Sequence, residues 1–227
     1  MAKKHRNRFL MKVKEFWSAN PVLVNGLTLA PVAVAAIYLK NAVALSLTLA
    51  VITIPTLLVA SLIRQRLPLA HRIPIYAVIS AICYAGATAL IKLWLPETVE
   101  TVGIYLPLMI TNTIVVMRAE AFGVRNKTRW VLLDALVQVL GYAFVICTVG
   151  LVREYIGNAT FWGNPVDNAL PITGIALPFG GLILLGLFAA FYQFINNHAA
   201  QRRLNAHITV STGDDEPAAI QTTEVTG

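Results

Sequence analysis

The chain has 227 residues, of which 57% are hydrophobic and 13% are charged, and its formal net charge is +7. Its mean hydropathy is +0.67. Ordinary soluble domains carry about 25% charged residues, so this composition excludes that class and indicates an integral membrane protein. The alternating pattern of a membrane barrel is absent, and α-helices are therefore the expected spanning elements.

Six apolar segments follow one another, and they predict an all-α polytopic membrane protein with six transmembrane helices. The segments are Pro21–Leu39, Ala42–Ile63, Ile73–Leu95, Gly103–Met117, Trp130–Val152 and Leu170–Ile195. Residues 21–196 are thus expected to form the membrane domain. The basic, amphipathic residues 1–20 predict an interfacial segment, and the polar residues 197–227 predict a disordered tail.

The basic residues indicate how the six helices are oriented. With the N-terminus in the cytoplasm, only Lys40, Lys92 and Arg153 among the Lys and Arg residues fall on the opposite side. The positive-inside rule therefore predicts that both termini are cytoplasmic. It also explains the net positive charge by topology and lipid headgroups, which we prefer to an interaction with nucleic acid.

The stretch from Gly103 to Gly123 is too short in its apolar part for a spanning helix, and Thr111, Asn112 and Thr113 lie in its middle. It is expected to be a broken half-helix. A backbone break within a bilayer is tolerated only where protein or a water-filled cavity covers it. The polar residues at the break are therefore candidates for the lining of a functional site.

The first apolar segment is expected to be a second broken helix. It contains Asn25, Gly26, Thr28 and Pro31, and Pro31 removes a backbone donor from the helix. The two broken segments then begin two three-helix halves, residues 21–95 and 103–195. Because each half has an odd number of spans, the halves form an inverted repeat, with a site expected near the midplane.

Polar residues near the cytoplasmic end of the fifth segment leave two interpretations open. Asp134, with Gln138 one turn later, is a functional candidate because carboxylates within spans are often functional. Its position also lets it meet the positive end of the helix dipole and the basic residues 125–129, which would make it an anchor. Arg118 and Glu120 are expected to pair with each other and to anchor the half-helix.

The two cysteines, Cys83 and Cys147, lie in different apolar segments at different expected depths. They are expected to be packing residues, and neither a disulfide nor a metal pair is predicted. The sequence contains no Gly-rich phosphate loop, HExxH motif or Ser/His/Asp arrangement. No catalytic residue is therefore predicted, and independent catalysis by this chain is not expected.

Three stretches together resemble a known family: Arg72–Tyr76, Gly103–Phe122 and Leu151–Gly157. In order and spacing, residues 20–195 resemble the RnfE (RsxE) subunits of ion-translocating Rnf electron transport complexes. They are more distantly similar to the NqrD subunits of Na⁺-translocating NADH:quinone reductase. The chain is thus identified as a member of the RnfE/NqrD family.

The resemblance implies a multi-pass subunit of the bacterial inner membrane that pairs, in opposite orientation, with an RnfA-like subunit. It implies further partners similar to RnfB, RnfC, RnfD and RnfG, in a complex that couples electron transfer between NADH and ferredoxin or flavodoxin to ion translocation. In such a pair the half-helices meet near the membrane centre, where two cysteines from each partner hold a [2Fe-2S] cluster.

The chain departs from the family at both cluster positions. Thr28 follows Gly-Leu and Thr113 follows Thr-Asn, where the family has cysteines. A threonine hydroxyl is a hard, neutral oxygen and a poor replacement for a thiolate at iron, so two ligands are missing. The resemblance places the cofactor-binding positions at Thr28 and Thr113. The residues expected to line the site beside them are Asn25, Gly26, Thr111 and Asn112.

Three hypotheses about function remain at this point. The first is a membrane subunit of an Rnf-type complex, in which the cluster is altered or absent or the chain is mainly a scaffold. The second is a secondary transporter with a midplane solute or ion site at the broken helices. The third is an assembly factor without an electron or ion path.

Overall fold

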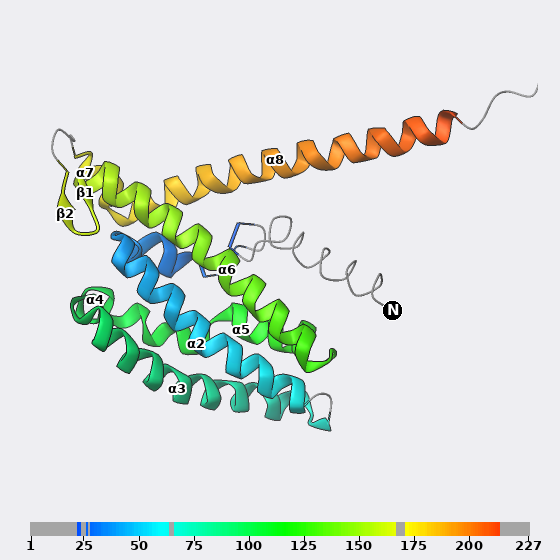
Figure 1. Ribbon diagram of the computed structural model, residues 1–227, viewed down its shortest axis with the longest axis horizontal. Helices are drawn as coiled ribbons and strands as arrows, with labels where there is room; N and C mark the ends of the chain where they lie inside the picture. The colour runs from blue at the N-terminus through cyan, green and yellow to red at the C-terminus, as the bar shows by residue number, and fades with distance from the viewer. Residues whose placement is uncertain (1–21, 24–25, 27, 64–65, 167–170, 214–227) are drawn as a thin grey trace, which may run out of the picture. The chain divides into compact units, whose positions relative to one another are not determined.

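The computed structural model describes residues 22–213 except 24–25, 27, 64–65 and 167–170 (Figure 1). The described part is mostly helical. Its elements are η1 (Pro31–Ala35), α2 (Leu39–Ile63), α3 (Leu69–Trp94), α4 (Pro96–Val102), η3 (Gly103–Tyr105), η4 (Pro107–Thr111), α5 (Thr113–Arg118), η5 (Ala119–Gly123), α6 (Thr128–Val152), η6 (Arg153–Gly157), β1 (Thr160–Phe161), β2 (Asn164–Pro165), α7 (Thr173–Ala176) and α8 (Pro178–Gly213).

Helix α2 is the central element, and it packs against both α3 and α6 (Figure 1). It is apolar all round and can therefore be buried on more than one side. It runs antiparallel to α6, since Leu39 at its start contacts Glu154 and Ser61 near its end contacts Thr128. The apolar core at that second end joins α2, α3, η5 and α6 and consists of Leu57, Ala60, Tyr76, Ala119, Val131 and Ala135.

Four helices among the described residues are long and apolar enough to cross a membrane: Leu39–Ile63, Leu69–Trp94, Thr128–Gly157 and Pro178–His198. A fifth span is formed if the bent pair Pro96–Tyr105 and Pro107–Gly123, which meet at 51°, is counted as one. The chain is therefore a multi-pass membrane protein. About half of the apolar windows of α2 and α6 is buried, whereas α3 and α8 are mostly exposed and present apolar side chains outward.

The predicted segments agree best with the structure where the sequence is uninterrupted. Helices α2, α3 and α6 match the second, third and fifth predicted segments to within a few residues. The first segment, Pro21–Leu39, does not form a long helix in its described part, where a turn at Val22 and Leu23 precedes the short η1. Helical backbone begins at Leu29, two residues before Pro31, which occupies the first position of η1.

The sixth predicted segment, Leu170–Ile195, is divided and extended in the structure. Helix α7 ends at Ala176, Leu177 is extended, and α8 begins at Pro178 and continues to Gly213. The structure thus assigns helix to residues 197–213, where the sequence favoured a disordered tail. Residues 1–20 and 214–227 lie outside the described residues.

The described part of the connection between α6 and α7 contains defined secondary structure. Helix α6 continues into the π-turn η6, and a two-stranded antiparallel hairpin follows, with Thr160 paired to Pro165 and Phe161 to Asn164. The backbone contacts divide the chain after Ala189 into two units, residues 1–189 and 190–227. The candidate site lies wholly within the first unit.

Candidate functional site

The segment that contains Thr28 has an irregular backbone. Gly26 and Thr28 both have left-handed backbones, with φ of +63° and +58°. This conformation is ordinary for glycine but costly for a β-branched residue, so the surrounding structure must hold Thr28 in place. The predicted interruption before Pro31 is therefore present. Asn25, predicted to line the same site, lies outside the described residues.

The segment that contains Thr113 is interrupted as predicted. The 3-10 turn η4 ends at Thr111, Asn112 is extended with ψ of 128°, and Thr113 begins α5. Asn112 is 4% exposed, and its side-chain oxygen accepts a hydrogen bond from Ile114 N at 2.9 Å. The asparagine thereby caps the half-helix at a point where water is not available to its backbone donors.

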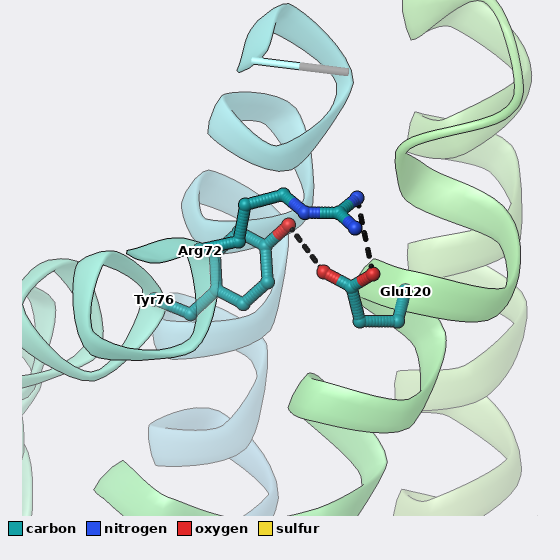
Figure 2. Close-up of polar contacts among 3 residues, drawn as sticks. All are labelled: Arg72, Tyr76 and Glu120. Atoms are coloured by element: carbon teal, nitrogen blue, oxygen red, sulfur yellow. Dashed lines mark hydrogen bonds and ion pairs between the residues drawn. The ribbon is translucent and has the colours of Figure 1, made fainter. Parts of the chain in front are cut away.

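The other end of this half-helix is held by charged side chains from two neighbouring helices. Arg118 lies 3.9 Å from Asp134 of α6. Glu120 lies 3.1 Å from Arg72 of α3 and accepts a hydrogen bond from the Tyr76 hydroxyl at 2.9 Å (Figure 2). The prediction that Arg118 and Glu120 pair with each other is wrong, because side chains two residues apart on a helix point in different directions.

Asp134 and Gln138 are both buried in α6, at 0% and 1% exposure. Their spacing of four residues places them on one face of the helix. The contact between Asp134 and Arg118 is consistent with an anchoring role for this carboxylate. It also means that Asp134 does not face the interior as an uncompensated charge.

Arg153 is fully buried and forms a clamp between two interrupted segments. Its guanidinium donates to the carbonyl oxygens of Ala33 at 2.7 Å and Ala36 at 3.2 Å, at the end of η1. It also donates to Ile175 at 3.2 Å, Ala176 at 2.8 Å and Leu177 at 3.2 Å, where α7 ends. A cation suits these positions because carbonyl groups without partners make the C-terminal end of a helix negative.

Glu154 performs the complementary task on backbone N–H groups. One carboxylate oxygen accepts from Leu39 N at 2.7 Å, at the start of α2. The other accepts from Gly163 N at 2.6 Å and from the Thr160 hydroxyl at 3.5 Å, in the hairpin. An anion at a helix N-terminus is favourable, so the adjacent Arg153 and Glu154 together hold helix ends of both polarities.

The start of α8 approaches this clamp closely. An ideal Cβ at Gly181 would overlap the carbonyl oxygen of Ala33 and lie 3.0 Å from the Arg153 guanidinium. One at Gly180 would overlap the carbonyl oxygen of Gly174. Gly181 is therefore needed for α8 to reach the end of η1, and Gly180 for it to pack against α7.

The sequence did not single out the clamp as a site. Arg153 was interpreted as a charge of the external side, although the run Leu151–Gly157 was noted as a shared motif. A signal was nevertheless present, since two consecutive charged residues directly follow a long apolar segment. Burial at such a position implies that the charges have partners.

The donor groups at Thr28 and Thr113 do not fit a thiolate-held iron–sulfur cluster, because both supply only hydroxyl oxygens. Cys83 and Cys147 are partly buried on α3 and α6 respectively and form no disulfide. Within the part of the chain that the structure describes, no three His, Cys, Asp or Glu side chains gather into a group suited to a metal ion.

Comparisons with known proteins all point to one family of membrane subunits. A family model described as "Rnf-Nqr subunit, membrane protein" matches residues 9–195. The E subunit of the ion-translocating oxidoreductase complex of Shewanella piezotolerans is 30% identical over 226 residues, which cover 92% of this chain and 94% of that protein. The proteins of the same name from Shewanella sp. strains MR-4 and ANA-3 are 30% and 31% identical and cover 86% and 82% of this chain, with 90% and 87% of their own lengths matched.

Proposed function

Because the chain belongs to the Rnf-Nqr family of membrane subunits, we propose that it is the E-type subunit of an Rnf-type ion-translocating oxidoreductase complex. The observation that carries the proposal is the match along almost the whole chain to relatives that bear this subunit name. In this proposal the complex couples electron transfer between NADH and ferredoxin or flavodoxin to ion movement across the bacterial inner membrane. The family assignment does not favour the solute transporter.

The number of spans, their repeat and their orientation are part of the same proposal. Six spans, an inverted repeat of residues 21–95 and 103–195, and cytoplasmic termini remain our interpretation of the sequence. The interrupted backbones at Thr28 and Asn112 support it, since breaks in two corresponding segments are a sign of inverted repeats. An RnfA-like subunit in opposite orientation would cover these breaks, as the bilayer requires.

In this proposal the chain supports the two half-helices structurally. Arg153 fixes the carbonyl end of η1, while Asp134 and Arg72 fix the charged end of α5 and η5. These contacts hold Thr28 and Thr113 at two backbone breaks. Because both positions carry hydroxyl groups, electron transfer through a cluster ligated by them is not part of the proposal.

Co-purification tests the proposal directly. The tagged chain is expressed in its native cells, and the membranes are extracted in mild detergent. The redox subunits of an Rnf-type complex should co-purify with it, and deleting its gene should abolish NADH-dependent ferredoxin reduction by membrane vesicles. Purification of the chain alone from active vesicles, with activity unchanged after deletion, would exclude this function.

The cofactor question has its own measurement. Iron, acid-labile sulfide and the EPR spectrum of the reduced complex are compared between the wild type and the double variant Thr28→Cys, Thr113→Cys. We expect an additional [2Fe-2S] signal only in the variant. An equal signal in the wild type would show that other groups complete the site and that the ligand argument fails.

A further inference from the structure

A pocket of about 240 Å³ opens beside the first turn of α2. It lies between this turn, helix α4 and the β-hairpin, and none of its lining residues belongs to the predicted half-helix site. Its side-chain lining consists of Tyr38, Lys40, Asn41, Glu97, Thr98 and Thr101, and Gly163 adds a backbone wall. Neither the family relationship nor the proposed electron-transfer role assigns a ligand to it.

Two opposite charges line this pocket. Lys40 comes from α2 and Glu97 from the first turn of α4. Within the described part of the chain, no ion pair joins these two side chains. A ligand with both a negative and a positive group could therefore contact each of them and bridge the pocket.

The walls of the pocket are fixed before any ligand binds. Glu154 accepts from Leu39 N at 2.7 Å and from Gly163 N at 2.6 Å, which ties the start of α2 to the hairpin. Asn41 is 3% exposed, and its side-chain nitrogen donates to the Ala35 carbonyl at 3.2 Å. A preformed site loses less conformational freedom on binding, which favours affinity.

The pocket lies at the level where the apolar helices end. Helix α2 begins at Leu39, and α3 ends at Trp94, whose side chain is 76% exposed. Exposed tryptophan and tyrosine residues at helix ends mark the headgroup region of a bilayer. Lys40 and Glu97 lie within a few residues of these ends, at the level where lipid headgroups are expected.

The balance of charges on the side of the membrane where the pocket lies indicates which class of lipid headgroup would suit it. In the predicted topology this side carries three basic residues, Lys40, Lys92 and Arg153, and four acidic ones, Glu97, Glu100, Glu154 and Asp167. The opposite ends of the same helices carry a surplus of arginine and lysine, to which anionic lipids are attracted. A zwitterionic headgroup therefore suits the pocket end better than an anionic one.

We propose that this pocket binds the phosphoethanolamine headgroup of a membrane phospholipid. The Lys40 ammonium donates to the phosphate, and the ammonium of the ligand donates to the Glu97 carboxylate. The hydroxyl groups of Thr98 and Thr101 supply further hydrogen bonds. The proposal is independent of the electron-transfer function, because it rests on the pocket, the ends of the apolar helices and the charges beside them.

Lipid titration monitored by native mass spectrometry tests it. The purified full-length chain in detergent micelles is titrated with phosphatidylethanolamine, phosphatidylcholine and phosphatidylglycerol that carry identical acyl chains. Phosphatidylethanolamine should bind about tenfold more tightly than the other two. Its ammonium donates hydrogen bonds to Glu97, whereas the methylated choline cannot. Equal binding of all three lipids, or tightest binding of phosphatidylglycerol, would overturn the proposal.

Matched variants locate the selectivity. Lys40→Gln with Glu97→Gln should abolish the preference for phosphatidylethanolamine. The control Lys92→Gln with Glu100→Gln makes the same charge change at positions that do not line the pocket and should preserve it. A preference that survives in the first double variant would refute the assignment of the pocket.

Two further arms complete the test. If the first double variant is misfolded by circular dichroism, the single variant Glu97→Gln replaces it and should weaken the preference; an unchanged preference in that folded variant would refute the assignment. Free O-phosphoethanolamine at the lipid concentration should not displace the bound lipid, because it lacks the acyl chains that the bilayer level provides. Displacement by the free compound would exclude a membrane lipid as the occupant.

Discussion

Replacing Arg153 by methionine should destabilise the membrane domain strongly. The change removes five hydrogen bonds to the carbonyl oxygens of η1 and of the end of α7. At about 0.6 kcal/mol for each polar contact between membrane helices, their sum is about 3 kcal/mol. Carbonyl groups left buried without a donor raise the expected loss to about 3–5 kcal/mol.

The conservative variant Arg153→Lys separates the effect of the hydrogen bonds from the effect of side-chain volume. A lysine at position 153 has three donors and can retain only part of the network, so Arg153→Lys should lose about 1–2 kcal/mol. Both variants are measured by equilibrium unfolding in mixed micelles with increasing dodecyl sulfate. Lys92→Met, at an exposed position, serves as the control and should stay within about 0.5 kcal/mol of the wild type.

The result that would refute this reasoning is specific. If Arg153→Met unfolds within about 1 kcal/mol of the wild type, the five contacts do not hold the two segments. An equal loss in the lysine and methionine variants would also contradict the clamp, because the lysine retains the charge and three donors. A loss graded from lysine to methionine is the outcome that the geometry predicts.

Three further predictions concern the segments that the clamp and the ion pairs hold. Gly181→Ala should lower the free energy of unfolding by about 1–3 kcal/mol through overlap with η1, whereas Gly186→Ala, with open space around it, should be neutral in the same assay. Asn112→Ala should cost about 1 kcal/mol by removing the cap of α5, and Asn112→Asp should restore most of it; equal losses would argue against capping. Tyr76→Phe should cost about 1 kcal/mol in the wild type but much less beside Glu120→Gln, and additive losses in this double-mutant cycle would exclude the coupling shown in Figure 2.

The broken helices show how far local sequence signals reach. Polar residues and a proline within short apolar segments predicted interruptions near Thr28 and Asn112, and both interruptions are present. The same signals did not predict the division of the sixth segment at Leu177. Where the helix divides depends on which neighbouring groups bond to the backbone N–H and C=O groups that the interruption leaves without partners.

The charged residues show the opposite case. Sequence proximity suggested that Arg118 pairs with Glu120, but side chains two residues apart on a helix point in different directions. The structure pairs them with α6 and α3 instead. Likewise, the distribution of lysines and arginines along the sequence did not indicate that Arg153 is buried.

The sequence by itself determined the class of the protein, the long spans and the family. These follow from composition, from the length of apolar runs and from motifs, all of which are local properties of the chain. Only the tertiary structure decided the partners of Arg153, Glu154 and Glu120 and the pocket at Lys40. Each of these joins groups that are distant in sequence, because a buried charge takes whichever partners the packed helices bring within hydrogen-bonding distance.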